Sequence, residues 1–209
     1  MMGMLRLLIP MKNDEYAVNK KIPDELRDVI LKALSFYPVL KTVKIDFVIT
    51  NDIRKSVMQA QPHFKSMFFG KSTRRRYVVK ISRSFELQGK KIPIQELPED
   101  VLIGWIGHEL GHIMDYLDKS NIELTIFGLA YVSSPGFINS AERAADTYAV
   151  SNGLGKYILA TKEFILHQAG MPEAYIRKMN KLYLPPEEIM RLMEGLETKE
   201  EIKEVVEQS

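Results

Sequence analysis

The feature that most constrains this chain is an apolar helical stretch, residues 98–118, that carries the sequence HELGH at positions 108–112. Pro98 and the two acids after it mark a helix start, where the positive end of the helix dipole favours acidic side chains. His108 and His112 are four residues apart, so an α-helix places both imidazoles on one face. Because buried polar groups without partners destabilise a fold, this helix needs a partner for its histidines.

A divalent metal ion is such a partner. In the HExxH pattern two histidines hold one tetrahedral ion, and the glutamate between them, here Glu109, stands beside the open coordination position. The chain has four histidines. With that content, HExxH is expected by chance in about one of a hundred such chains or fewer. The chain has no cysteine, which excludes thiolate ligands and disulfides. We therefore predict one Zn²⁺ ion per chain, held by His, Asp or Glu.

Two histidines need at least one further protein ligand, and a catalytic site keeps a fourth position for water. Asp118 lies where the longer HExxHxxGxxH motif would carry its last ligand, but the glycine turn of that motif is absent. His63 and His167 are the other histidines of the chain, and neither belongs to a companion pattern. These three residues are candidates without a supporting motif.

The candidate with a supporting pattern is Glu142, which stands four residues before Asp146. A helix places both carboxylates on one face, and the small residues Ala141, Ala144 and Ala145 permit a neighbouring helix to approach closely. One carboxylate can bind the metal while the other accepts the free ring N–H of a ligand histidine. The alternative is that Glu142 closes a capping box and Asp146 is exposed. The pair favours the metal-binding interpretation.

HELGH followed by Glu-x-x-x-Asp at 142–146 resembles the gluzincin metallopeptidases. The wording Glu-x-x-Ala-Asp is similar to the branch that includes the CAAX prenyl proteases and their soluble or membrane-bound bacterial relatives. The resemblance covers about residues 43–152. It implies a role for each residue already named: zinc ligands His108, His112 and Glu142, catalytic base Glu109, and Asp146 as the group that orients His108.

The resemblance also implies a place for the substrate. In such enzymes the strands before the active helix form a small sheet, and its edge receives the substrate backbone as an added strand. Here that edge would lie near residues 65–69, with 77–82 beside it, so a peptide or protein substrate is expected. A group that stabilises the transition state has no defining motif, and the candidates are His167, Tyr148, Tyr157 and Tyr131.

The apolar periodicity predicts an α+β fold that is mainly helical, with a small, mostly antiparallel sheet beside the HExxH helix and a helical C-terminal half. A β-branched run at 43–50 predicts a strand, 52–61 is expected to form a short helix, and strand-like runs at 64–69 and 77–82 predict a hairpin. The helices are expected at about 23–36, 98–118, 122–132, 140–152, 156–168, 172–182, 186–194 and 198–207.

A length of 209 residues fits one large domain with a small appendage. We predict a zincin-like metallopeptidase domain over residues 1–170 and a C-terminal helical appendage over 171–209. From Pro185 onward the chain has eight Glu against one Arg and two Lys, a net charge of −5. This acidic end is interpreted as a solvated helical surface.

The charge balance and the longest apolar run exclude other classes. Twenty-nine Lys and Arg against 27 Asp and Glu leave a net charge of +2, too small a field for non-specific binding of nucleic acid. The run at 122–132 is shorter than the roughly 20 residues of a membrane-spanning helix. The first ten residues make a poor secretory signal. We expect a cytoplasmic protein with no spanning segment and no nucleic-acid partner.

The expected activity is hydrolysis of a peptide bond by a metal-activated water, with Glu109 as general base. Two alternatives remain open at this stage. The first is a non-catalytic, zinc-stabilised interaction module that docks a partner through its acidic C-terminus or the basic cluster at 71–76. The second is a latent protease in which a segment such as 122–132 covers the cleft.

Overall fold

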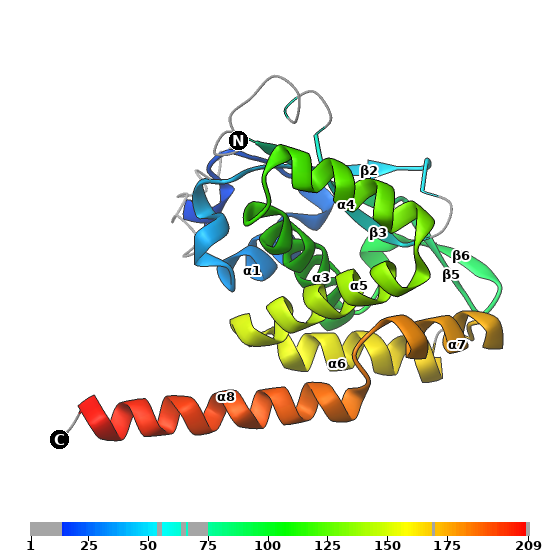
Figure 1. Cartoon of the computed structure of the whole chain (residues 1–209). Helices are drawn as coiled ribbons and strands as arrows, with labels where there is room; N and C mark the ends of the chain where they lie inside the picture. The colour runs from blue at the N-terminus through cyan, green and yellow to red at the C-terminus, as the bar shows by residue number, and fades with distance from the viewer. Residues whose placement is uncertain (1–13, 54–55, 64–65, 67–74, 169, 208–209) are drawn as a thin grey trace, which may run out of the picture.

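The computed structural model describes residues 14–53, 56–63, 66, 75–168 and 170–207. The fold is α+β and mainly helical, which confirms the predicted class. Its central element is helix α3 (Glu99–Leu117), in which every residue from 101 to 113 is buried. Helices α1, α5 and α6 and strand β3 pack around it (Figure 1). The bounds of these helices are Arg27–Ser35 for α1, Pro135–Ala149 for α5 and Gly155–Glu163 for α6.

The main sheet has four strands in the order β1-β2-β4-β3. The pairs β1/β2 and β2/β4 are parallel and β3/β4 is antiparallel, so the sheet is mixed, where the sequence had predicted a mostly antiparallel one. One face carries the buried side chains that pack on the helices. A separate hairpin is formed by β5 and β6. The strand bounds are Lys20–Lys21, Lys44–Thr50, Met58–Pro62, Arg76–Ser82, Ser84–Leu87 and Lys90–Pro93 for β1 to β6.

Strand β3 corrects the prediction of a short helix at 52–61. Its sequence, Met-Gln-Ala-Gln-Pro, favours a helix locally, but Met58 and Ala60 alternate with more exposed glutamines and face the core. Pairing with β4 and burial of one face override the local preference. The antiparallel partner of β4 is therefore β3. The predicted strand at 64–69, and with it the substrate edge at 65–69, lies outside the described residues except for Ser66.

The helical half differs from the prediction mainly at its boundaries. Helix α5 begins at Pro135, because Pro fits the first helical turn and the Ser134 side chain accepts a hydrogen bond from the backbone N–H of Phe137. The helices predicted at 186–194 and 198–207 form one helix, α8, that continues through Gly195. The remaining helices are α4 (Asn121–Ser133), α7 (Glu173–Leu182) and α8 (Pro186–Glu207). Shorter turns are Asp14–Ala17, Asp24–Leu26, Pro38–Thr42, Ile94–Glu96, Val150–Leu154 and Phe164–Gln168.

Glycines let α3 lie unusually close to its neighbours. A Cβ atom placed on Gly111 would lie 2.3 Å from the carbonyl oxygen of Ala145 in α5. A Cβ atom on Gly104 would lie 2.3 Å from the carbonyl oxygen of Tyr157 in α6. Both distances are shorter than a side chain tolerates, so any larger residue at either position would force the backbones of α3 and its neighbour apart. The first contact brings the HExxH helix against the helix that carries Glu142.

The C-terminal end of α3 is held by a member of the basic cluster. Arg75 is buried and donates hydrogen bonds to the carbonyl oxygens of Tyr116, at 3.0 Å, and Lys119. A guanidinium at this place donates hydrogen bonds to helix-terminal carbonyls, and its positive charge interacts favourably with the negative end of the helix dipole. Residues 71–74 of the cluster lie outside the described part of the chain. Arg75 therefore has a role in the fold.

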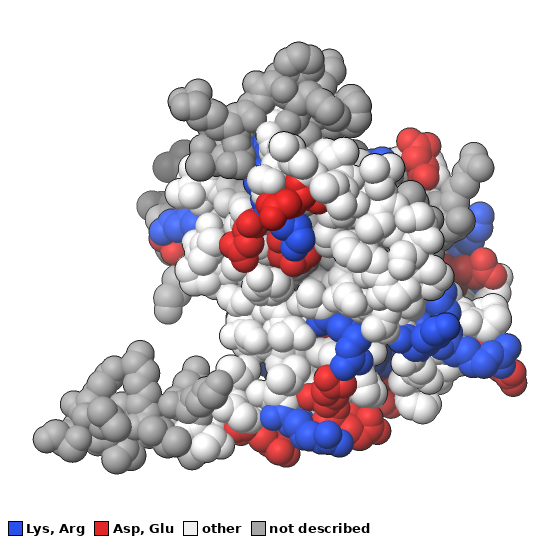
Figure 2. Space-filling view, viewed as in Figure 1, with Lys and Arg blue, Asp and Glu red and all other residues white. Residues whose placement is uncertain are grey.

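The C-terminal segment contributes to the same hydrophobic core as the rest of the chain. Leu184 and Ile189 are buried within that core, and Arg143 of α5 makes two hydrogen bonds of 2.6 and 2.7 Å to Glu188. Farther along, α8 extends away from the body (Figure 1). Figure 2 shows charged side chains gathered over α6 to α8, whereas the face over α4 is mostly uncharged. A domain boundary near residue 170 stays a prediction.

No helix in the described part of the chain combines the length and the hydropathy needed to cross a membrane. The run at 122–132, the longest apolar run of the sequence, belongs to α4. Its inner face is buried through Leu124 and Phe127, while Ile122, Ile126 and Leu129 on the other face are exposed. This segment therefore packs on the body of the protein along one side only.

Candidate metal centre

The structure brings His108, His112 and Glu142 together between α3 and α5. The two histidines come from successive turns of α3, and Glu142 reaches them from α5 across the close contact at Gly111. One ligand atom from each of the three side chains lies within 4.8 Å of the others, and all three residues are buried. The alternative reading of Glu142 as a helix-capping residue does not hold, because Glu142 lies inside α5.

The spacing of these atoms fits a small divalent ion. Oε2 of Glu142 lies 3.1 Å from Nε2 of His108 and 3.5 Å from Nε2 of His112. Ligands held at about 2.0–2.1 Å by a tetrahedral ion lie about 3.3 Å apart. The three side chains therefore already point to one place, and the buried group could hold a metal ion.

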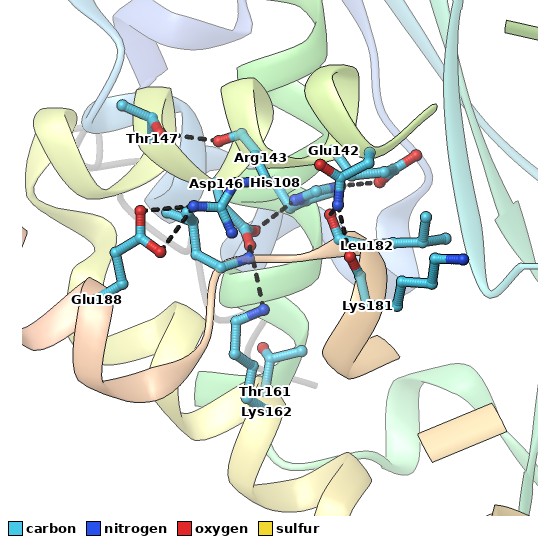
Figure 3. Close-up of polar contacts among 12 residues, drawn as sticks. His108, Glu142, Arg143, Asp146, Thr147, Thr161, Lys162, Lys181, Leu182 and Glu188 are labelled. Carbon is cyan, nitrogen blue, oxygen red and sulfur yellow. Dashed lines mark hydrogen bonds and ion pairs between the residues drawn. The ribbon is translucent and has the colours of Figure 1, made fainter. Parts of the chain in front are cut away.

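Asp146, one turn after Glu142, holds the first histidine. Its Oδ1 accepts a hydrogen bond from Nδ1 of His108 at 2.8 Å, while Oδ2 accepts from Nζ of Lys162 at 3.1 Å and from the backbone N–H of Leu184 at 3.0 Å (Figure 3). Asp146 is only 1% exposed. With Nδ1 bound to this carboxylate, Nε2 of His108 is turned toward Glu142, which is the arrangement that orients a metal-ligating imidazole.

The second histidine is held in a different way. Nδ1 of His112 is buried and has no hydrogen-bond partner among the described residues. Its ring stacks instead on Tyr116, with centroids 6.1 Å apart and planes inclined by 18°. The ring of His108 stands edge-on to that of His112, at 4.8 Å. Both Nε2 atoms face Glu142, but Nδ1 of His108 is held by a hydrogen bond, whereas the Nδ1 side of His112 is held by packing.

The hydrogen bonds between His108 and its carboxylate neighbours shift the pKa values of the site. Burial alone would lower the pKa of His108, but its hydrogen bonds to Asp146 and Glu142 outweigh burial and raise that pKa to about 10. Burial likewise opposes ionisation of Glu142, yet the hydrogen bonds with His108 and His112 hold its pKa far below the ordinary range. In the absence of a metal ion, both pKa shifts favour a protonated His108 between the two carboxylates. A metal ion would take the place of the proton on Nε2, since ligands bind in deprotonated form.

Glu109 lies beside this group and contacts the sheet. Its Oε2 accepts a hydrogen bond from the backbone N–H of Ala60 in β3 at 2.5 Å. Burial raises the pKa of Glu109 above that of an ordinary glutamate, although the neighbouring histidines act against this. A carboxylate with a raised pKa is a better proton acceptor near neutral pH. The edge strand therefore fixes one oxygen of the predicted base.

Glu142 has a further partner that the sequence did not single out for this role. The hydroxyl of Tyr131 in α4 donates to Oε1 of Glu142 at 2.5 Å. The other three candidates for a transition-state group make different contacts. Tyr148 donates to Asp118 at 3.2 Å, Tyr157 packs edge-on against Phe36, and His167 is exposed beside Glu163.

The three alternative metal ligands, Asp118, His63 and His167, make contacts elsewhere in the structure. Asp118 is exposed and accepts the hydrogen bond from Tyr148. His167 has a side-chain exposure of 64%. The backbone N–H of His63 donates to the carbonyl oxygen of Arg76 at the end of the β3/β4 pair. None of these three histidine or aspartate side chains belongs to the metal-ligating group found among the described residues.

A pocket opens beside His108 and Glu109. It is bounded by α3, the start of β3, α6, α7 and the segment after α7, and its walls include Met58, Trp105 and Ile158. Sequence reasoning missed two neighbours of the metal-binding group here: the ring of Tyr183 lies 5.3 Å from that of His108, and Nζ of Lys162 lies 5.0 Å from the Tyr183 ring. Neither residue belongs to a motif, and only tertiary packing brings them to the site.

The chain matches no protein-family model, no curated protein and no solved structure. The centre combines two imidazoles and a carboxylate that converge on one point, a second carboxylate, Glu109, beside them, and an aspartate hydrogen-bonded to the first imidazole.

Proposed function

We propose that this protein is a zinc-dependent peptidase in which Glu109 acts as general base. The observation that carries the proposal is the buried convergence of His108, His112 and Glu142 with Glu109 beside them. This donor set, two imidazoles and one carboxylate, suits zinc and leaves one coordination position for water. A purely structural zinc site usually has a fourth protein ligand, whereas three side chains form the group among the described residues.

The roles of the residues follow from their contacts. A bound zinc ion would supply Lewis acidity, which lowers the pKa of a coordinated water and polarises the scissile carbonyl. Glu109 accepts the proton of the attacking water and later delivers it to the leaving amine. Asp146 keeps Nδ1 of His108 protonated and Nε2 directed at the centre. These residues would supply the metal ligands and the general base of metal-assisted peptide hydrolysis.

A peptide substrate is supported by the position of β3. This strand lies at the edge of the sheet, and its Ala60 N–H reaches Glu109, so a chain that lies along β3 passes the proposed base. An edge strand can bind an extended peptide through those backbone groups that are not already bound, as the Ala60 N–H is to Glu109. The pocket walls at Met58, Trp105 and Ile158 are apolar and suit a side chain of the bound peptide. We place the substrate along β3, a few residues before the edge expected from the sequence.

The proposal is tested by Glu109→Gln. This variant should retain zinc near one ion per chain and lose hydrolysis, because the ligands remain and the base is removed. The readout is a proteome-wide cleavage-site profile that compares wild type with the variant, with metal content measured on the same samples. Glu99→Gln, at the exposed start of the same helix, is the matched control and should cleave as wild type does. Cleavage by Glu109→Gln at the wild-type rate would refute the role of the base.

A further inference from the structure

The two oxygen atoms of the Glu142 carboxylate have different partners. Oε2 faces Nε2 of His108 and of His112, and Oε1 accepts the hydroxyl of Tyr131 at 2.5 Å. A phenol bound to a carboxylate at this distance is a charge-assisted hydrogen bond, which is stronger than one between neutral groups. Tyr131 therefore determines which oxygen of Glu142 is presented to the histidines.

Tyr131 comes from α4, which belongs to neither of the ligand-bearing helices. An aromatic cluster fastens α4 to both of them. The Tyr131 ring stacks on Phe127 at 6.2 Å, and Phe127 stands edge-on to Tyr116 of α3 at 5.5 Å and to Phe137 of α5 at 4.8 Å. Tyr116 in turn stacks on His112 at 6.1 Å. Helix α4 thus touches the surroundings of two of the three proposed ligands.

Helix α4 is a separate unit along the chain. It begins with a capping box, in which the side chains of Ser120 and Glu123 bind each other's backbone N–H, and it ends at Ser133, next to Ser134, whose side chain caps the start of α5. Its outer face is exposed. The docking of α4 therefore depends on its inner face, which carries Phe127 and the hydroxyl of Tyr131.

We propose that Tyr131 is a positioning residue of the metal centre, which holds Glu142 in a one-oxygen binding geometry and couples metal binding to the docking of α4. The inference rests on the proposed function, since it assumes that the centre binds zinc. Removal of a group that orients a metal ligand typically weakens metal affinity by about 10- to 100-fold. The coupling is reciprocal, so a bound ion must also stabilise the docked position of α4.

The first test is a titration of metal-free protein with Zn²⁺ and with Co²⁺. Tyr131→Phe keeps the ring in the aromatic cluster and removes only the hydroxyl. We expect about 10- to 100-fold weaker binding and a changed Co²⁺ absorption spectrum, because the freed Oε1 alters the geometry of the carboxylate ligand. Tyr148→Phe is the matched control, since it removes a tyrosine–carboxylate hydrogen bond to exposed Asp118. It should bind both ions as wild type does.

The second measurement uses wild-type protein alone, so that it holds even if Tyr131→Phe folds poorly. Amide hydrogen exchange over residues 121–133 should slow when Zn²⁺ saturates the protein. Wild-type affinity and spectrum in Tyr131→Phe, or unchanged exchange in α4 on metal binding, would overturn the inference and leave the proposed function standing. Wild-type protein that binds neither ion would overturn the proposed function, and the inference with it.

Discussion

Asp146 binds Nδ1 of His108 at 2.8 Å with one carboxylate oxygen and the buried ammonium of Lys162 at 3.1 Å with the other. A single buried side chain thus joins a proposed metal ligand on α3 to a cation on α6. Burial opposes the charge on Asp146, but the bond to His108 and the charge of Lys162 keep its pKa below the ordinary range. The carboxylate therefore serves both the metal centre and the fold.

Asp146→Asn should lower both the stability of the fold and the affinity for zinc. The amide cannot keep the carboxylate's charge, so Lys162 loses its buried partner and we expect a loss of about 3–5 kcal/mol in the free energy of unfolding. Metal affinity should fall by about 10- to 100-fold, because His108 is less firmly oriented. Urea unfolding and zinc titration measure the two quantities. Asp118→Asn, an exposed aspartate, should change neither, and unchanged values in Asp146→Asn would contradict the account.

The close contact of α3 and α5 predicts a steric effect at Gly111. In Gly111→Ala the new Cβ would meet the carbonyl oxygen of Ala145 at 2.3 Å, so the helices must separate and carry Glu142 away from the histidines. Such overpacking costs about 1–3 kcal/mol and should also reduce zinc affinity. Gly128→Ala is the control, because a Cβ there meets no atom within 4 Å and alanine favours the helix. Thermal unfolding of the two variants should move in opposite directions.

The raised pKa of His108 predicts how the stability of the metal-free protein depends on pH. The folded protein holds the proton up to a pKa of about 10, whereas an ordinary histidine releases it near 6.5. Between these values the folded state binds more protons than the unfolded state, so the stabilisation present below pH 6.5 is lost as the pH rises toward 10. Urea unfolding in the presence of a chelator should show this decline.

Two comparisons isolate the contribution of His108. His108→Gln should flatten the decline, whereas His167→Gln, at an exposed histidine, should leave it unchanged. Zinc affinity should show the opposite trend and increase with pH, because the ion competes with the proton for Nε2. A metal-free wild type whose stability relative to His108→Gln increases toward high pH would contradict a raised pKa of His108.

The predicted division near residue 170 has a direct test. A chain that ends at residue 170 would lack Leu184 and Ile189 of the core and the Leu184 N–H that binds Asp146. We expect it to unfold at a lower urea concentration than the full chain and to bind zinc more weakly. A chain that ends at residue 196 keeps these contacts and should behave as the full protein does. Equal stability of the 1–170 chain would support an independent domain.

The local part of this architecture is readable from the sequence. The four-residue spacings of His108 with His112 and of Glu142 with Asp146 predict two helix faces, and the structure brings those faces together. The sequence predicts a helix where β3 forms, because Met58 and Ala60 favour a helix locally. Only pairing with β4 makes this segment a strand. The helices expected at 186–194 and 198–207 form the single helix α8, because one glycine, Gly195, weakens a helix by only about 1 kcal/mol and the good helix formers around it offset this loss.

Contacts that depend on tertiary packing have no local signal. Lys162 looks like any lysine on an amphipathic helix, yet the approach of α6 to α3 at Gly104 places it on Asp146. Tyr183 follows α7, and its ring reaches His108 only through the path of the chain after that helix. Tyr131 was one of four candidates, and its contact with Glu142 depends on how α4 docks.

The most direct measurement is an anomalous-difference map, collected at the zinc absorption edge, from crystals of the protein purified with zinc. The account predicts one strong peak between α3 and α5, within bonding distance of Nε2 of His108, Nε2 of His112 and Oε2 of Glu142, with solvent as the fourth ligand. A map without a peak there, or a peak whose fourth ligand is another side chain, would contradict a catalytic metal centre in this protein.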